Sequence, residues 1–181
     1  DRWEEWRKLE TDQKKGIPAP LPEKPCGDNV ALYDLVSPAD ITVGRMPLIE
    51  AIRRRRSHRQ FIQSPLTLEE LSFLLWATQG VSKIVTGNDG RVIRTLRTSP
   101  SGGARHPFET YLLVNRIESL APALYRYLPL EHKLCLLRVD ADLVEQVHEA
   151  SNGQFIRDCA VAFIWTVIPY RTEWRYSIVS P

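Results

Sequence analysis

A run of basic residues carries the clearest chemistry in the sequence. Residues 53–56 are four consecutive arginines, and Ser57, His58 and Arg59 follow them directly. Glu50 is the only acid within one helical turn upstream, so nearby carboxylates cannot neutralise the whole run. A guanidinium presents a planar fork of donors that matches a phosphate, and a serine hydroxyl adds one more donor. We therefore expect an anion site here, and its candidate residues are Arg55, Arg56, Ser57 and Arg59.

The same run has two other interpretations. Pro47, followed by apolar residues at 48, 49 and 52, predicts a helix that leads into the arginines, so Arg53 and Arg54 fit a solvated helix end and His58 a spacer. Alternatively, residues 53–59 and the arginines at 91, 94 and 97 form a nucleic-acid or acidic-partner binding module. A formal net charge of +2 argues against a general nucleic-acid coat, so nucleic acid is not the expected partner.

A glycine-rich segment, residues 99–107, reads Ser-Pro-Ser-Gly-Gly-Ala-Arg-His-Pro and directly precedes a predicted strand. Its adjacent glycines, Gly102 and Gly103, allow the backbone to approach a planar ligand, such as a flavin or nucleotide ring, and to present amide donors to it. The segment has neither the spacing of a Gly-x-Gly-x-x-Gly loop nor the Walker lysine, and it is not a Gly-x-Ser-x-Gly elbow. A plain glycine-rich turn is the alternative interpretation.

Local patterns predict the elements that would position these motifs. Residues 67–70 form a capping box, Thr-Leu-Glu-Glu, and the apolar spacing after it predicts a helix that ends at Gly80. Asn-Asp-Gly at 88–90 predicts a small hairpin. Further predicted elements are strands at 110–114, 123–127 and 134–139, a helix at 141–150 and a buried strand at 159–168. Because strands and helices mix without a regular βαβ repeat, we predict an α+β fold.

The composition narrows the class of protein. With 43% hydrophobic and 25% charged residues among 181, the chain has the usage of one globular domain. Cys26, Cys135 and Cys159 are odd in number and far apart, so we expect neither a disulfide framework nor a zinc site, and a reducing, cytoplasmic compartment. The four histidines lack metal-ligand spacing, so we expect no metal. The longest apolar run, 159–168, is shorter than the roughly 18 residues of a membrane span, and we expect no membrane partner.

The first thirty residues differ from the rest of the chain. Trp3, Trp6 and Leu9 lie at helical spacing within residues 1–15, and four prolines between positions 18 and 25 then forbid regular structure. We expect residues 1–30 to form a short helix and an extended tether, and residues 31–181 to form the domain. The charged start has no initiator methionine, which suggests a piece of a longer protein.

Two motifs together resemble the nitroreductase superfamily. They are Arg-Arg-Ser-His-Arg-Gln-Phe at 55–61 and, after the capped helix, Pro-Ser-Gly-Gly-Ala-Arg-His-Pro-Phe-Glu-Thr-Tyr at 100–111. The Pro-Ser-x-Gly-x-x-His-Pro form of the second motif looks most like the SagB/ThcOx-type branch, which includes azoline dehydrogenases. The resemblance covers about residues 47–181, and the family normally continues with a further helix-rich segment that this chain lacks.

The resemblance implies an α+β homodimer that binds FMN non-covalently and transfers hydride at the flavin. On this analogy the phosphate and ribityl chain contact Arg55, Arg56, Ser57 and Arg59, and the isoalloxazine ring lies beside Pro100, Ser101, Gly102 and Gly103. The implied substrates are a peptide azoline, a nitro compound or a quinone, and NAD(P)H is a candidate hydride donor. A flavin fold that has lost turnover and serves as a scaffold is the alternative.

The azoline branch also has a Lys-Tyr pair near the flavin, and this sequence has Trp174-Arg175-Tyr176 at the corresponding place. Tyr176 is thus the candidate acid or base. Arg175 replaces the lysine, and because a guanidinium stays protonated, it can orient or stabilise an anion but cannot take a proton. Simple aromatic packing after the last strand is the alternative interpretation of Trp174 and Tyr176.

Overall fold

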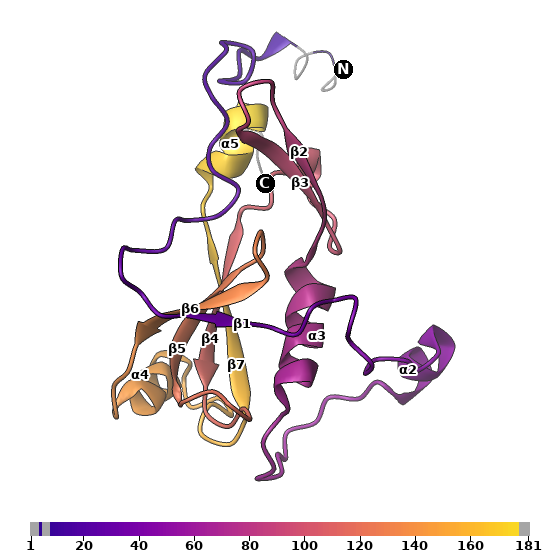
Figure 1. The fold of residues 1–181 in the computed structure, drawn as a ribbon, viewed down its shortest axis with the longest axis vertical. Helices are drawn as coiled ribbons and strands as arrows, with labels where there is room; N and C mark the ends of the chain where they lie inside the picture. The colour runs from indigo at the N-terminus through magenta and orange to yellow at the C-terminus, as the bar shows by residue number, and fades with distance from the viewer. Residues whose placement is uncertain (1–3, 5–7, 178–181) are drawn as a thin grey trace.

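The computed structural model describes residue 4 and residues 8–177. Its centre is an antiparallel five-stranded sheet with the strand order β1-β6-β5-β4-β7 (Figure 1). These strands are β1 (Leu32–Asp34), β4 (Phe108–Val114), β5 (Ala123–Leu128), β6 (Lys133–Arg138) and β7 (Val161–Val167). A separate hairpin pairs β2 (Val81–Thr86) with β3 (Val92–Arg97). The helices are α2 (Leu48–Arg54), α3 (Leu68–Gln79), α4 (Leu143–Ala150), α5 (Tyr170–Tyr176) and the 3-10 turn η1 (Gly102–Ala104).

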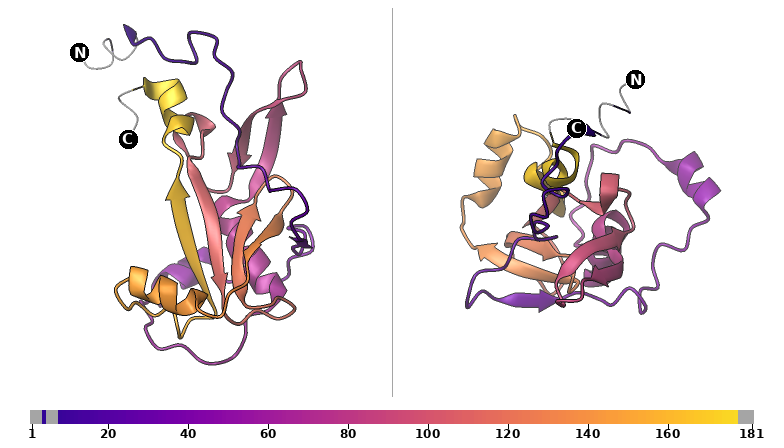
Figure 2. Two further views of the ribbon diagram at one scale, coloured as in Figure 1. Left: turned by 90° about the vertical axis from the view of Figure 1, so that its left-hand side faces the viewer. Right: turned by 90° about the horizontal axis from the view of Figure 1, so that it is seen from above.

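This arrangement confirms the predicted α+β class and most of the predicted elements. The hairpin forms around the Asn-Asp-Gly turn, and the helix expected at 141–150 is α4. Helix α2 begins directly after Pro47 and carries Arg53 and Arg54 in its last turn, as the apolar spacing predicted. Figure 2 shows α2 projecting from the body of the chain.

Helix α3 supplies one side of the hydrophobic core. Its capping box is complete: the Glu70 amide donates to Thr67 Oγ1 at 3.1 Å, and the Thr67 amide donates to Glu70 Oε2 at 2.9 Å. Leu71 and Leu75 are fully buried in one cluster with residues of the sheet such as Tyr125, and each contributes roughly 1.5–3 kcal/mol. At 12 residues, α3 is the longest helix in the described part of the chain, where no helix has the length and apolarity to cross a membrane.

Strand β7 is present where a buried strand was predicted, but its predicted burial is wrong. It pairs with β4 along its whole length and forms the edge of the sheet. Trp165 is 51% exposed and Val167 55% exposed. The apolar run therefore predicted a strand correctly. Because edge strands and central strands can both be apolar, the run did not reveal that β7 has a neighbouring strand on one side only.

The expectation that the cysteines form no disulfide is also wrong. Cys26 and Cys135 form a disulfide bond that joins positions 109 residues apart, whereas Cys159 is free and buried. Strand β6 holds Cys135 in the core, and the N-terminal segment runs past it, so the two Cα atoms lie 6.6 Å apart. The argument from cysteine usage to a reducing compartment consequently no longer holds.

The N-terminal segment is not a free tether. Of the helix expected over residues 1–15, residues 1–3 and 5–7 lie outside the described residues, residues 9–11 have no regular structure and residues 12–16 form turns. Residues 17–26 are extended, as the prolines predicted, but they lie along α5, β3 and β5 and hydrogen-bond to them (Figures 1 and 2). Strand β1 then pairs with β6 and continues this attachment to the sheet.

Candidate functional site

The structure brings two of the predicted site motifs together. Gly103 has a φ of +60°, and a Cβ placed there would clash with the Arg175 side chain, lying 2.6 Å from Nε, and would stand 2.8 Å from the Tyr176 hydroxyl oxygen. At Gly102 the same Cβ would lie 3.6 Å from the Tyr176 ring. Only a backbone without side chains fits so closely against this pair. The glycine loop and the C-terminal end of α5 are therefore in contact and form one candidate site.

Hydrogen bonds fix the glycine loop from within. Ser101 Oγ accepts a hydrogen bond from the His106 amide at 2.9 Å, so this hydroxyl stabilises the turn. Arg105 spans the loop, because its Nε donates to the Gly103 carbonyl at 3.3 Å and its Nη2 donates to the Ile93 carbonyl of β3 at 2.7 Å. Pro100, the remaining predicted residue of this motif, is exposed at the start of the loop.

Arg105 also connects the loop to α5. Its guanidinium carbon lies 4.9 Å from the centroid of the Trp174 ring, a cation–π contact. Burial, together with the nearby Arg175 charge, lowers the pKa of Arg105 from its usual value. Arg175 in turn lies over the Tyr176 ring, 5.7 Å from its centroid. Arg105 and Arg175 thus give the site a cationic environment, which suits a ligand that carries or gains negative charge.

His106 is a structural residue of this loop. The residue is 5% exposed, and Nε2 lies 3.2 Å from the Thr95 carbonyl of β3. Because a carbonyl only accepts, Nε2 carries the proton in this contact. Burial, and then the Arg97 charge, lower the pKa of His106 to about 4, which keeps the ring neutral near pH 7. The neutral ring joins the loop to β3 instead of presenting itself to a ligand.

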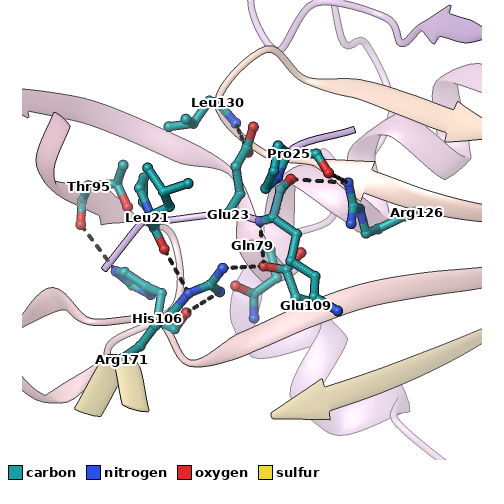
Figure 3. Close-up of polar contacts among 12 residues, drawn as sticks. Leu21, Glu23, Pro25, Gln79, Thr95, His106, Glu109, Arg126, Leu130 and Arg171 are labelled. Carbon is teal, nitrogen blue, oxygen red and sulfur yellow. Dashed lines mark hydrogen bonds and ion pairs between the residues drawn. The ribbon is translucent and has the colours of Figure 1, made fainter. Parts of the chain in front are cut away.

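A buried ion pair holds α5 against the sheet, and the sequence alone did not predict it. Arg171 Nη2 pairs with Glu109 Oε1 of β4, and the two side chains are 3% and 2% exposed (Figure 3). Arg171 Nη1 also donates to the His106 carbonyl at 3.3 Å. The one signal available in the sequence was the position of Glu109, an acid inside a mostly apolar strand.

The arginine segment lies elsewhere. Residues 55–59 are exposed, and Figures 1 and 2 place α2, and the segment that follows it, well away from α5 and the glycine loop. Arg54 pairs with Glu50 at 2.9 Å, and Arg56 Nη1 donates to the carbonyls of Arg53 and Arg55. The single chain therefore does not bring the predicted phosphate residues to the predicted ring residues.

One arginine assigned to the alternative binding module is used inside the fold. Arg97 donates to Gln79 Oε1 at 3.1 Å and to the Pro22 carbonyl at 3.0 Å, and burial lowers its pKa to about 10. It is not available to a nucleic acid in this conformation. Among the described residues, no group of three or more His, Cys, Asp or Glu side chains is placed to hold a metal ion.

Comparisons with known proteins agree with the motifs. A protein of Methanocaldococcus jannaschii named "putative nitroreductase" is 35% identical over 96 residues, which cover 50% of this chain and 44% of that protein. Two crystal structures of proteins described in the same words, from Anabaena variabilis and Ralstonia eutropha, have a similar fold. They match with TM-scores of 0.65 and 0.56, at 24% and 28% identity, over 96% and 91% of this chain.

The chain is shorter than each of these relatives. It spans 44% of the length of the M. jannaschii protein, and 31% and 65% of the lengths of the two solved chains. The family model described as "Nitroreductase family" matches residues 52–180, which include the arginine segment, the glycine loop and α5. Since this match covers more than half of the sequence, the chain belongs to the nitroreductase family.

Proposed function

We propose that the chain is part of an FMN-dependent oxidoreductase that transfers hydride to or from a small molecule or an azoline-like group of a modified peptide. The observation that carries this proposal is the contact of Gly102 and Gly103 with Arg175 and Tyr176. The glycine backbone there faces the Tyr176 hydroxyl, which can donate a proton, and the permanently charged Arg175 guanidinium. Such groups suit the edge of a redox-active ring. The azoline branch is the finer part of the proposal, and it rests on the residues of the second motif.

The arginine segment has the chemistry to hold the FMN phosphate. Glu50 neutralises Arg54, and the described part of the chain places no carboxylate within ion-pair distance of Arg55, Arg56 or Arg59. These guanidiniums and the Ser57 hydroxyl lie within five consecutive positions and are exposed. Because a charge-assisted hydrogen bond contributes about 1.5–3 kcal/mol, two or three of them suffice to anchor a phosphate.

At the ring end, the backbone of residues 100–103 would face the flavin, which supplies the hydride chemistry when bound. Arg105 holds that backbone in place through the Gly103 carbonyl. Tyr176 presents a hydroxyl that can donate or accept a proton, whereas Arg175 stays protonated and orients or stabilises an anionic group. The cationic environment favours negative charge on a group that lies beside Arg175 and Tyr176.

A homodimer is part of the proposal. Helix α2 has no buried residue, and its apolar residues Leu48, Ile49 and Ile52 are exposed by 56–75%. A groove of about 720 Å³ with a mostly apolar lining, including Leu74 and Phe163, separates α3 from β7. A second copy would cover such surfaces, and an FMN site at the interface of two copies is what the family resemblance implies.

Flavin uptake by the purified protein tests the proposal. We expect a yellow protein, or a colourless one that binds added FMN with quenching of the flavin fluorescence, and reduction of the bound flavin by NAD(P)H or another hydride donor. Bound flavin without turnover in the presence of varied donors and acceptors would instead identify a scaffold. Protein that neither contains nor binds FMN would contradict the proposal.

A further inference from the structure

The N-terminal segment contributes to the geometry of the site. Residues 12–26, called the strap below, precede the part of the chain that the family model matches, residues 52–180. Figures 1 and 2 show the N-terminal segment running from beside α5 toward β1, and the last residue of the strap, Cys26, forms a disulfide with Cys135 of β6. The strap therefore connects α5, which carries Arg175 and Tyr176, to strand β6.

The first half of the strap binds α5 through backbone and side-chain groups. The Gln13 amide donates to the Trp174 carbonyl at 2.9 Å, and Trp174 Nε1 donates to the Ile17 carbonyl at 2.8 Å. Three more hydrogen bonds join Tyr170 to Asp12 at 2.9 Å, Arg175 to Gln13 at 3.2 Å and Arg171 to Leu21 at 2.9 Å. Helix α5 has only seven residues, too few to be stable by itself, so these bonds help to fix its position.

The second half of the strap supplies partners for buried charges (Figure 3). Arg126 is 6% exposed, and its Nη2 donates to the Lys24 and Pro25 carbonyls at 3.0 and 2.9 Å. Its Nε has no partner among the described residues, so the strap provides hydrogen bonds on which this guanidinium depends. Glu109, the partner of Arg171, likewise accepts from the Lys24 amide at 3.0 Å. Departure of the strap would remove these hydrogen bonds from Arg126 and Glu109.

The disulfide joins the end of the strap to the core. Cys135 is fully buried, whereas Cys26 is half-buried and is followed by exposed residues at 27–29. Cys26 is thus the more accessible of the two residues, so we expect a reductant to attack its sulfur and Cys135 to be the sulfur that leaves. Once the disulfide is broken, only hydrogen bonds would hold the strap to the rest of the chain.

We propose that the Cys26–Cys135 disulfide is a redox-sensitive lock on the strap, and that the strap in turn positions α5, and with it Arg175 and Tyr176, against the glycine loop. The assignment of Arg175 and Tyr176 to a reactive site rests on the proposed function. The reductant is a dithiol: one thiolate attacks Cys26 Sγ, the S–S bond breaks, and Cys135 leaves as a thiolate that takes up a proton. The second thiol of the reductant then closes its own disulfide and releases Cys26 as a thiol, so two electrons and two protons pass to the cysteine pair.

Hydrogen exchange of the protein without flavin tests this proposal, before and after treatment with dithiothreitol. Reduction should speed exchange of the Gln13 amide and the α5 amides at least tenfold, and leave the amides of β4 and β5 unchanged. Cys26→Ser should match the reduced protein, whereas Cys159→Ser should still respond to the reductant. Equal exchange in both redox states would overturn the proposal, and so would exchange that rises equally in β4, because that would be global unfolding.

A thiol count and a tryptophan variant make the test complete. Unreduced protein in denaturant should show one reactive thiol, that of Cys159, and three would overturn the proposal because the lock would be absent. Trp174→Phe removes the bond to Ile17 and keeps a ring, so it should speed strap exchange without reduction, whereas Trp165→Phe on exposed β7 should not. Since none of these measurements involves FMN, failure to bind flavin would contradict the proposed function and leave this inference standing.

Discussion

Gly103 lies directly against Tyr176: a Cβ added to the glycine would stand 2.8 Å from the tyrosine hydroxyl oxygen. The two residues are 73 positions apart, and the ion pair between Arg171 and Glu109 is one of the contacts that hold α5 in place. The close approach explains why glycine is needed here.

Gly103→Ala should therefore disturb the site more than the fold. A left-handed backbone costs alanine about 1–2 kcal/mol, and the new methyl group would push Arg175 and Tyr176 away. Gly90→Ala is a matched control, since Gly90 has a φ of +77° and open space around its Cβ position. Urea unfolding should show a similar loss for both variants, and only Gly103→Ala should weaken FMN binding. Equal FMN affinity in the two variants would show that the close approach has no part in the site.

The buried ion pair should be costly to break. Glu109→Gln keeps the size of the side chain and an acceptor for the Lys24 amide, but leaves the Arg171 charge buried without its counter-ion. We expect a loss of about 3–5 kcal/mol in the free energy of unfolding, measured by chemical denaturation. Glu145→Gln, which breaks the exposed pair with Arg157, should change stability little. A loss at Glu109 no larger than that at Glu145 would contradict the role assigned to the pair.

His106 should make stability fall in mild acid. Its pKa is about 4 in the folded protein, and about 6.5 is usual for an unfolded chain, so the unfolded state binds more protons between these values. Its contribution is complete above about pH 6.5 and is lost as the pH falls toward 4, roughly 3 kcal/mol in all. His106→Gln should flatten this part of the pH profile of unfolding, whereas His58→Gln, on the exposed arginine segment, should keep it. An unchanged profile in His106→Gln would be inconsistent with a neutral, buried ring.

A charge on the apolar side of α2 should weaken the proposed homodimer. Ile52 is 62% exposed in the single chain, so Ile52→Asp should leave the fold intact while disfavouring a dimer that covers it. Sedimentation would measure the dissociation constant, which we expect to rise at least tenfold. Val139→Asp, at an equally exposed position after β6, is the control. A dimer that is indifferent to Ile52→Asp would place the interface elsewhere.

Local signals predicted the local structure well. The capping box at Thr67 and Glu70, Pro47 before α2 and the Asn-Asp-Gly turn each act within a few residues, so the sequence reveals them directly. The family motifs also named the glycine loop and the pair at the end of α5, which the structure places in contact. The contacts that join the glycine loop to Arg175 and Tyr176 could not be predicted from such local signals.

The missed features depend on contacts between distant positions. The disulfide joins residues 109 apart, and a count of three cysteines does not reveal such a pair. The prolines predicted that the strap is extended. They did not predict that its carbonyls accept hydrogen bonds from buried arginines of β5 and α5. Edge and interior strands likewise share an apolar pattern, which is why the exposure of β7 was missed.

The phosphate assignment is the central claim, and FMN affinity of an Arg56→Ala, Arg59→Ala double variant tests it most directly. Loss of two charge-assisted bonds should weaken binding by at least about a hundredfold. Arg53→Ala, at the solvated end of α2, is the control and should bind FMN like the unaltered protein. The measurement is a fluorescence titration with FMN at constant ionic strength. Affinity lost in the double variant and kept in the control is the predicted result, and equal affinity in all three proteins would contradict the account.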